Sequence, residues 1–322
     1  MKKRKSKRAL LTGANGFIGR PLLIHLLASG WEVSILSSSG LLPEYLPIGS
    51  KVKLFQINDS DIQIASTDID AFFNFSVAYD VPGKSLDELN LTNSDLPIKI
   101  LSAIIKNNNE SVTCVLGDTF YRKFPLDSTL RPNYVKSKNL LVERLREIVP
   151  KNNKSIRVAL LIIEQVYGVG EKLYKAYPKV ICQMLDKNIT SIPLTSCTQS
   201  RDFIYVTDVV IAAIIVAKQK WNGLLEIDCG SGKATNLHYI FSHLAYLTNT
   251  KANLGFGELS PHQNINESKG DIKILSSFGW KPKVSLEDGL AALVADVRLR
   301  ISREAPLDKL QDEPTFSTKN WK

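Results

Sequence analysis

Two side chains with acid–base chemistry stand four residues apart in the string Tyr134-Val-Lys-Ser-Lys138. On a helix, residues at this spacing share one face, so the phenol and the ammonium would reach the same pocket. An isolated phenol has a pKa of about 10, and a neighbouring ammonium favours the phenolate and lowers that pKa. The pair therefore has the chemistry to exchange a proton near neutral pH. A simple pair on a helix surface is the alternative that this common spacing also allows.

A second motif, Thr12-Gly-Ala-Asn-Gly-Phe-Ile-Gly19, has the residues that hold a dinucleotide. Gly13 permits a tight turn, Gly16 lets backbone N–H groups approach a pyrophosphate, and Gly19 allows close contact between a helix and a strand. The N-terminus of the following helix adds unpaired N–H donors and the positive end of its dipole. Because a strand-length run precedes the motif and a helical run follows it, the context favours a dinucleotide site over a purely structural turn.

The end of the second predicted strand bears on which dinucleotide binds. A carboxylate at that place would bind the ribose 2′-hydroxyl of NAD, but this chain has Ser37-Ser38-Ser39. No carboxylate there repels a 2′-phosphate, and the hydroxyls are able to donate to one. The serines favour NADP(H), with NAD(H) left open because no arginine lies nearby in the sequence.

Elements that would position these motifs follow from the apolar pattern. Strands are predicted over 8–11, 32–36, 53–57, 71–75, 111–116 and 156–163, and helices over 17–29, 94–106 and 134–149. Such alternation predicts an α/β fold with a doubly wound parallel sheet. The pattern becomes less regular past Gly170, which predicts a smaller interleaved lobe. We expect a Rossmann dinucleotide-binding domain over 1–168 with return elements about 199–230, a substrate-binding lobe over 169–198 and 231–305, and a flexible tail over 306–322.

The composition of the 322 residues, with 44% hydrophobic and 23% charged, is ordinary for a soluble globular protein. No apolar run approaches the ~20 residues of a membrane span, and no export signal follows the basic N-terminus, so we expect a cytoplasmic protein. The net charge of +9 is concentrated in the first eight residues, six of which are Lys or Arg. This favours a solvated arm over nucleic-acid binding. The four cysteines and four histidines lack metal-ligand spacing, so no metal site is predicted.

Taken together, the motifs resemble the extended short-chain dehydrogenase/reductases, the family of nucleotide-sugar epimerases, dehydratases and reductases. The resemblance spans roughly residues 8 to 300. Besides the two motifs above, it rests on Asn93 before an apolar helix, Val166-Tyr167-Gly168, Arg201-Asp-Phe-Ile-Tyr-Val-Thr-Asp208, Gly230-Ser-Gly232, and Phe278-Gly-Trp-Lys-Pro-Lys283 with Leu286-Glu-Asp-Gly-Leu290.

This resemblance implies roles for individual residues. Tyr134 would donate a proton to the substrate, Thr119 would polarise the substrate carbonyl, and Lys138 would tune Tyr134 and bind the nicotinamide ribose. The implied cofactor site comprises Gly13, Asn15, Gly16, Phe17, Ile18, Gly19, Ser37, Ser38, Asp59, Ser76, Val77, Asn93, Tyr134 and Lys138.

The resemblance also implies a substrate site that contains Thr119, Gln165 and Arg201. The paired N–H donors of Arg201 suit the oxygens of the substrate's pyrophosphate. A structural ion pair of this arginine with Asp202 or Asp208 is the alternative.

Departures from the family pattern narrow the expected reaction. Gly117 stands where most members have Ser or Thr, which leaves Thr119 as the hydroxyl beside the carbonyl. Dehydratases of the family have Thr-Asp-Glu where this chain reads Gly117-Asp118-Thr119, and the missing Glu weakens a dehydratase reading. Ile162 and Val169 replace the Arg and Pro that relatives often carry.

Three strings, over 117–123, 163–168 and 201–205, are most similar to the CDP-abequose and CDP-paratose synthase type of 4-ketoreductase. The resemblance thus implies an NADP(H)-dependent 4-ketoreductase of a nucleotide-linked, CDP-type deoxysugar in O-antigen and lipopolysaccharide sugar biosynthesis, acting as a homodimer. An NAD-dependent nucleotide-sugar 4-epimerase is the first alternative. A non-catalytic dinucleotide-binding sensor or scaffold is the second, and Gly117 is the feature that favours it.

Overall fold

The computed structural model describes residues 6–46, 49–108, 110–129, 131–149, 156–260 and 265–303. Within these residues the main element is a parallel sheet of seven strands in the order β10-β6-β5-β4-β1-β2-β3. The chain runs outward from β1 to β3 and then restarts on the other side of β1 with β4, which makes the sheet doubly wound. The α/β, doubly wound fold class is therefore confirmed. The strands are β1 (Arg8–Thr12), β2 (Glu32–Ser37), β3 (Val52–Gln56), β4 (Ala71–Asn74), β5 (Val112–Thr119), β6 (Ile156–Ile163) and β10 (Gly223–Cys229).

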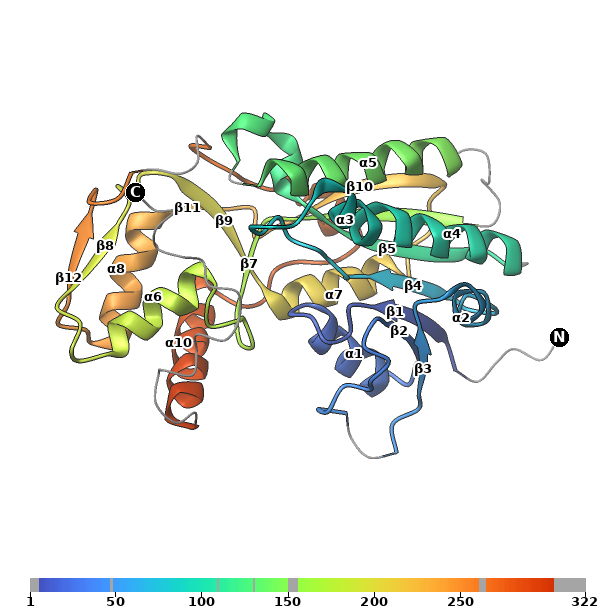
Figure 1. Cartoon of the computed structure of the whole chain (residues 1–322), viewed down its shortest axis with the longest axis horizontal. Helices are drawn as coiled ribbons and strands as arrows, with labels where there is room; N and C mark the ends of the chain where they lie inside the picture. Colours follow the sequence, from blue (N-terminus) through green and yellow to red (C-terminus); the bar gives the residue numbers. More distant parts are fainter. Residues whose placement is uncertain are drawn as a thin grey trace.

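Helices cover both faces of this sheet (Figure 1). One face packs against α1 (Gly19–Ala28) and α7 (Val206–Val216), and the opposite face packs against α2 (Asp59–Ala65), α4 (Leu96–Asn107) and α5 (Pro132–Ile148). The central strands are consequently buried on both sides, so β4 is buried at every position and β6 at all but one. Such strands appear in the sequence as continuous apolar runs rather than alternating ones.

A second group of elements lies at one end of the large sheet (Figure 1). Strand β6 leads directly into β7 (Gln165–Tyr167), which pairs with β9 (Ser200–Tyr205), and β9 pairs with β11 (Ala234–Asn236). Helix α9 (Lys273–Ser277) instead packs against β10 in the core of the large sheet. Beside β7, β9 and β11 lie the pair β8 (Ser191–Leu194) and β12 (Asn253–Phe256) and the helices α6 (Ala176–Leu185), α8 (Leu237–Thr248) and α10 (Leu286–Arg303). These elements share a separate apolar cluster that includes Tyr177, Phe203 and Leu293.

The chain crosses between the two groups more than once, because α7 and β10 return to the large sheet after β9. The proposed division into a dinucleotide-binding domain and a substrate-binding lobe stays a prediction. The expected tail over 306–322 and the first five residues of the basic arm lie outside the described residues.

Three further observations concern the described residues alone. None of their helices is both long and apolar enough to cross a bilayer. They contain no group of His, Cys, Asp or Glu side chains arranged to hold a metal ion. All four cysteines are free thiols, and three of them are buried.

Candidate functional site

The site lies where the parallel strands of the large sheet end. The carboxyl ends of β1, β4, β5 and β6 share one edge of the sheet, where β1 and β4 also mark the reversal in strand order. Ligands of doubly wound sheets bind at such an edge. The glycine turn follows β1 and leads into α1, as predicted.

Two of the three glycines in this turn are required by close backbone contacts. A Cβ atom on Gly13 would lie 2.5 Å from the backbone of Phe75 and Ser76, and the residue also has a φ of +75°. A Cβ atom on Gly19 would lie 1.9 Å from the carbonyl oxygen of Gly13. The turn is closed by a 2.8 Å hydrogen bond that the Gly16 N–H donates to Gly13. Helix α1 therefore begins directly against the end of β1.

The residues around the turn fit an anionic dinucleotide. Helix α1 has no acidic residue in its first turn and no side-chain cap, so no side chain of that turn compensates the positive end of its dipole. Asn15 and Gly16 are exposed in this turn, and the next two residues, Phe17 and Ile18, are partly buried. The amide of Asn74 accepts hydrogen bonds from Thr12 and Ser76, while its buried NH₂ group has no partner among the described residues.

Other residues of the predicted cofactor site stand at the same edge. Ser37 ends β2, and Ser38 follows it in an exposed position. Ser76 and Val77 belong to the loop after β4, next to Gly13. Asp59 begins α2, beyond the end of β3, and it is ion-paired with Lys99 at the surface.

Helix α5 presents Tyr134 and Lys138 on one buried face. Pro132 starts the helix, a position where its missing N–H costs nothing. Tyr134 is 7% exposed and Lys138 is 2% exposed, so neither belongs to a simple surface pair. The Lys138 ammonium donates a 2.9 Å hydrogen bond to the carbonyl oxygen of Gly117 at the end of β5, and its Nζ lies 6.0 Å from the centroid of the Tyr134 ring.

Burial decides the protonation of this pair. It raises the pKa of Tyr134 well above its ordinary value, the nearby Tyr79 and Asp118 add to the rise, and a hydrogen bond with Thr119 opposes it. Burial also lowers the pKa of Lys138. The prediction that Lys138 lowers the pKa of Tyr134 is therefore wrong for this structure, because desolvation of the phenol outweighs an ammonium that is bound to Gly117. Tyr134 holds its proton at neutral pH, as a proton donor must.

Thr119 is the last residue of β5 and is brought together with Tyr134, with which it shares the hydrogen bond described above. Its hydroxyl also accepts from the N–H of Tyr121, at the start of the short helical turn Phe120–Lys123. The neighbouring Asp118 is buried and pairs with Arg122 at 2.6 Å.

Arg122 connects Asp118 to more distant parts of the site. Its guanidinium also binds Glu226 of β10 at 2.8 Å, and Glu226 binds Arg146 of α5 at 2.8 Å. This chain of ion pairs connects the end of β5 to β10 and to the helix that carries Tyr134. The sequence does not predict these ion pairs, since Asp118 and Glu226 are far apart in the chain and no local pattern connects them.

Asn93 lies behind the site. It belongs to a π-helical turn, Leu91–Asp95, between α3 (Leu86–Asn90) and α4. Its amide accepts from the Ala78 N–H and donates to the Ala78 carbonyl, each at 2.8 Å, and donates to the Ser137 hydroxyl at 2.9 Å. Because the side chain is fully buried and these bonds are within the protein, Asn93 joins the loop after β4 to α5. Its place in the cofactor site stays a prediction.

Two of the three predicted substrate residues, Gln165 and Arg201, stand on adjacent strands. Gln165 begins β7 and is level with Phe203 of β9, while Arg201 is near the start of β9. The buried Arg201 guanidinium donates to the carbonyl oxygens of Ser200 at 2.7 Å and Ile265 at 2.9 Å. Burial lowers its pKa, and the nearby Tyr121, Tyr177 and Glu164 oppose that shift.

The two carboxylates considered as alternative partners of Arg201 hold loops of the protein. Asp202 accepts from the N–H groups of Ser231, Gly232 and Gly270 and from the Ser231 hydroxyl, over 2.6–3.1 Å. Asp208 accepts from the N–H groups of Lys283 and Val284 at 3.1 and 3.0 Å. Both carboxylates thus satisfy backbone donors of later segments, which explains their place in the Arg201–Asp208 motif.

A cluster that the sequence did not predict covers Tyr134. The ring of Tyr79 packs on the ring of Tyr134 with centroids 5.4 Å apart. Two cations lie over Tyr79, with the Lys175 Nζ at 4.1 Å and the Arg131 Cζ at 5.2 Å from its centroid. Nearby, burial raises the pKa of Glu171 to about 8, and burial lowers the pKa of Lys175 to about 8.

The buried Glu171 predicts a pH-dependent stability. In the unfolded chain its pKa is near 4.5, so between pH 4.5 and 8 the unfolded chain releases a proton that the native protein keeps. The stability of the wild type should therefore fall as the pH rises through this range. A Glu171→Gln variant removes the effect and should be more stable than the wild type by about 1–3 kcal/mol at pH 7.

Urea denaturation of both proteins at pH 5 and pH 7.5 measures this difference, which should be larger at pH 7.5. Glu147→Gln, which removes an exposed carboxylate from α5, controls for the change in net charge. A stability difference that is the same at both pH values would contradict the explanation.

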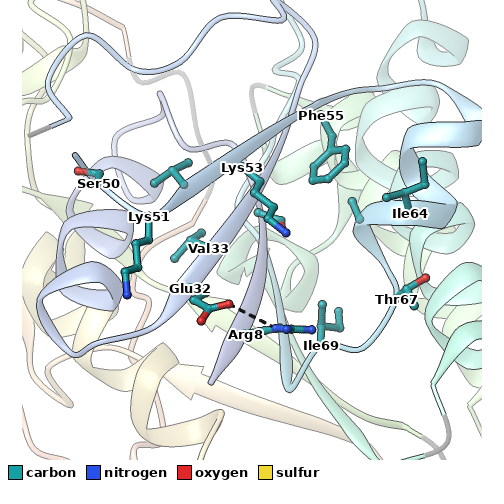
Figure 2. Close-up of a pocket in the computed structure, with 13 residues that line it drawn as sticks. Arg8, Glu32, Val33, Ser50, Lys51, Lys53, Phe55, Ile64, Thr67 and Ile69 are labelled. Atoms are coloured by element: carbon teal, nitrogen blue, oxygen red, sulfur yellow. Dashed lines mark hydrogen bonds and ion pairs between the residues drawn. The ribbon is translucent and has the colours of Figure 1, made fainter. Parts of the chain in front are cut away.

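A pocket also lies at the opposite edge of the large sheet, as Figure 2 shows. Arg8 and Glu32, the first residues of β1 and β2, form an ion pair at 3.4 Å there, and the pocket is further lined by Lys51, Lys53 and Phe55. Because Arg8 and Glu32 stand at the amino ends of β1 and β2, the pocket is separate from the glycine turn, which follows the carboxyl end of β1.

Comparison with known proteins agrees with this arrangement. Residues 9–227 match the family model described as the NAD dependent epimerase/dehydratase family. A CDP-abequose synthase of Salmonella muenchen is 28% identical over 293 residues, which cover 90% of this chain and 98% of that protein. A dTDP-4-dehydro-6-deoxyglucose reductase of Escherichia coli is 27% identical, again over 90% of this chain and 98% of that protein.

Solved structures are similar in fold. MoeE5 in complex with UDP-glucose and NAD superimposes with a TM-score of 0.76 at 22% identity, covering 91% of this chain and 99% of that one. The UDP-N-acetylglucosamine 4-epimerase from Methanobrevibacter ruminantium M1 gives a TM-score of 0.76 at 22% identity, covering 94% and 100%.

Proposed function

The chain belongs to the NAD dependent epimerase/dehydratase family, and from that premise we propose that it is an NADP(H)-dependent 4-ketoreductase of a nucleotide-linked deoxysugar. The proposed nucleotide is CDP, and the proposed product serves O-antigen and lipopolysaccharide sugar biosynthesis. The observation that carries the proposal is the buried Tyr134 next to Thr119, on a helix whose Lys138 binds the Gly117 carbonyl near the end of β5, at the sheet edge that also holds the glycine turn.

In the proposed mechanism, the reduced nicotinamide supplies the hydride for the C4 carbonyl carbon. Tyr134 gives its proton to the oxygen that becomes an alkoxide at C4, and Thr119 donates a hydrogen bond to the same oxygen. Lys138 would hold the nicotinamide ribose and support the charge that develops on the phenol. The N–H groups of the glycine turn would hold the cofactor's pyrophosphate, and Arg201 with Gln165 would hold the substrate's phosphates.

Two observations support reduction over removal of water. Asp118, which stands where dehydratases have an acidic pair, is buried and tied to Arg122, so it is poorly placed to exchange protons with a sugar. The position after it is Thr119 rather than a glutamate. The names of the two curated relatives, which are a synthase and a reductase, favour the same class of reaction.

The choice of nucleotide and of cofactor has separate support. The CDP-abequose synthase supports CDP as the nucleotide, and the serines at the end of β2 support NADP(H).

The experiment that tests the proposal supplies 4-keto-6-deoxy sugars linked to CDP, UDP, dTDP or GDP together with NADPH or NADH. We expect one mole of NADPH to be oxidised for each mole of sugar reduced, with the CDP-linked sugar and NADPH as the fastest pair. Conversion of a nucleotide sugar by protein that carries NAD, without added reductant, would instead identify a 4-epimerase. No turnover of any sugar, with dinucleotide binding intact, would identify a sensor or scaffold.

The proposal includes a homodimer in the cytoplasm, with no nucleic-acid partner. Light scattering of the purified protein tests the dimer, since a single 35.8 kDa chain and a pair of chains differ twofold in mass. A mass equal to one chain at assay concentrations would contradict it.

A further inference from the structure

Arg20 follows the last glycine of the turn and stacks on a residue from another segment. It is the second residue of α1, and its Cζ lies 4.2 Å from the centroid of the Tyr45 ring. The Tyr45 hydroxyl in turn donates a 2.7 Å hydrogen bond to the carbonyl oxygen of Ala14, inside the glycine turn. The segment that follows β2 is thus folded back onto the turn, and it holds Arg20 in a defined position beside it.

Within the described residues, no acidic side chain neutralises the positive charge of Arg20. Among the described residues, no carboxylate forms an ion pair with it, and the first turn of α1 contains no acidic residue. Burial raises the pKa of Tyr45 to about 12, so its phenol stays uncharged at neutral pH. The Arg20 guanidinium also makes a hydrogen bond with the Tyr45 side chain. Its several N–H donors leave others that are able to bind phosphate oxygens.

The end of β2 adds hydroxyl groups to the same part of the molecule. Leu36 pairs with Thr12 in the sheet, so Ser37, the last residue of β2, is level with Gly13, which follows β1. The Ser37 and Ser39 hydroxyls are 3.0 Å apart, and Ser38 is exposed. The position that would carry a carboxylate for a ribose 2′-hydroxyl therefore carries hydroxyls, with a fixed guanidinium on the adjacent helix.

From this arrangement we propose that Arg20, stacked on Tyr45, together with Ser37 and Ser38 forms the subsite for the 2′-phosphate of NADP(H). The inference deepens the proposed function only in its choice of cofactor. The sequence around the end of β2 contains no arginine for a 2′-phosphate. In the proposed subsite this cation is Arg20, which comes from the helix after β1.

The subsite is tested with two ligands that differ only in this phosphate, adenosine 2′,5′-bisphosphate and adenosine 5′-monophosphate. Isothermal titration of the full chain should show that the wild type binds the bisphosphate more tightly. Arg20→Gln should weaken binding of the bisphosphate by about 10- to 100-fold, the range for a charged hydrogen-bonded contact. It should change binding of the monophosphate by less than about twofold.

Further variants separate charge from position. Tyr45→Leu keeps Arg20 but removes the ring that holds it, so it should reduce the preference for the bisphosphate partially, whereas Tyr45→Phe, which keeps the ring, should retain most of it. Lys53→Gln removes an exposed cation near the opposite sheet edge and should leave both affinities unchanged.

The proposal is overturned if Arg20→Gln keeps the preference of the wild type, if it weakens both ligands equally, or if the wild type does not distinguish them. Neither ligand contains nicotinamide, and no turnover is measured. A protein that uses Arg20 in this way but reduces no 4-keto sugar would therefore refute the proposed reductase and leave the subsite standing. A reductase whose Arg20→Gln variant keeps the preference would do the reverse.

Discussion

Replacing Tyr134 by phenylalanine should lower kcat for reduction of the 4-keto sugar by about 10²- to 10⁴-fold, the contribution of a positioned general acid. The change removes the proton that the alkoxide needs and leaves the ring that packs on Tyr79. Because this ring and the backbone of α5 are retained, the affinity for NADPH and the melting temperature should change little. Initial rates of NADPH oxidation, together with a fluorescence titration of NADPH, measure the two effects separately.

Tyr239→Phe is the matched control for that variant. Tyr239 is a tyrosine on α8 whose hydroxyl also makes one hydrogen bond, to Glu287 at 2.9 Å, but it lies in the smaller group of elements. Its loss should leave kcat within about twofold of the wild type. Unchanged turnover by the Tyr134→Phe variant would refute the assigned proton donor and with it the proposed mechanism.

A single methyl group at position 19 should abolish tight binding of the dinucleotide. In Gly19→Ala the new Cβ would lie 1.9 Å from the carbonyl oxygen and 2.7 Å from the carbonyl carbon of Gly13, which are backbone atoms of the turn itself. Helix α1 must therefore move away from the end of β1. Its N-terminus would then no longer lie beside the glycine turn, where the two together would bind the pyrophosphate. We expect the affinity for NADPH to fall by about 10²-fold or more, and the free energy of unfolding to fall by about 1–3 kcal/mol.

Gly30→Ala provides the comparison at the other end of the same helix. Gly30 has a φ of +79°, but no atom lies within 4 Å of the Cβ that alanine would add. It should cost about 1–2 kcal/mol through its left-handed backbone alone and leave NADPH affinity unchanged. NADPH titration measures the loss of affinity in each variant, and thermal unfolding measures the loss of stability. If Gly19→Ala binds NADPH as the wild type does, the close contact between α1 and β1 is not needed for binding.

The larger sheet was predictable from the sequence because its strands are buried on both faces. The predicted runs over 32–36 and 156–163 correspond to β2 and β6 within one residue, and helix 134–149 corresponds to α5 within two. The strands of the smaller group are short, and β11 (Ala234–Asn236) is neither apolar nor alternating. Such segments become strands only through pairing with β9, which no local pattern records.

The same distinction holds within the site. The glycine turn and the spacing of Tyr134 and Lys138 are local, so the sequence predicted both. The stacking of Arg20 on Tyr45, and the packing of Tyr79 and Lys175 over Tyr134, depend on contacts between distant segments. The direction of the pKa shift of Tyr134 depends on burial, which outweighs the neighbouring charge considered in the sequence. Spacing alone does not reveal that desolvation.

The π-helical turn at Leu91–Asp95 has a consequence for how the chain can change in length. A π turn accommodates one more residue than the α-helix around it, and each α-helical residue advances the side chains by about 100°. Deleting one residue from 91–95 would restore regular helix and preserve most apolar burial, yet it would swing the Asn93 amide away from Ala78 and Ser137. The loop after β4 and helix α5, which carries the proposed proton donor, would then lose the hydrogen bonds through which Asn93 connects them. Natural variation in this stretch is therefore expected to replace side chains while conserving the number of residues.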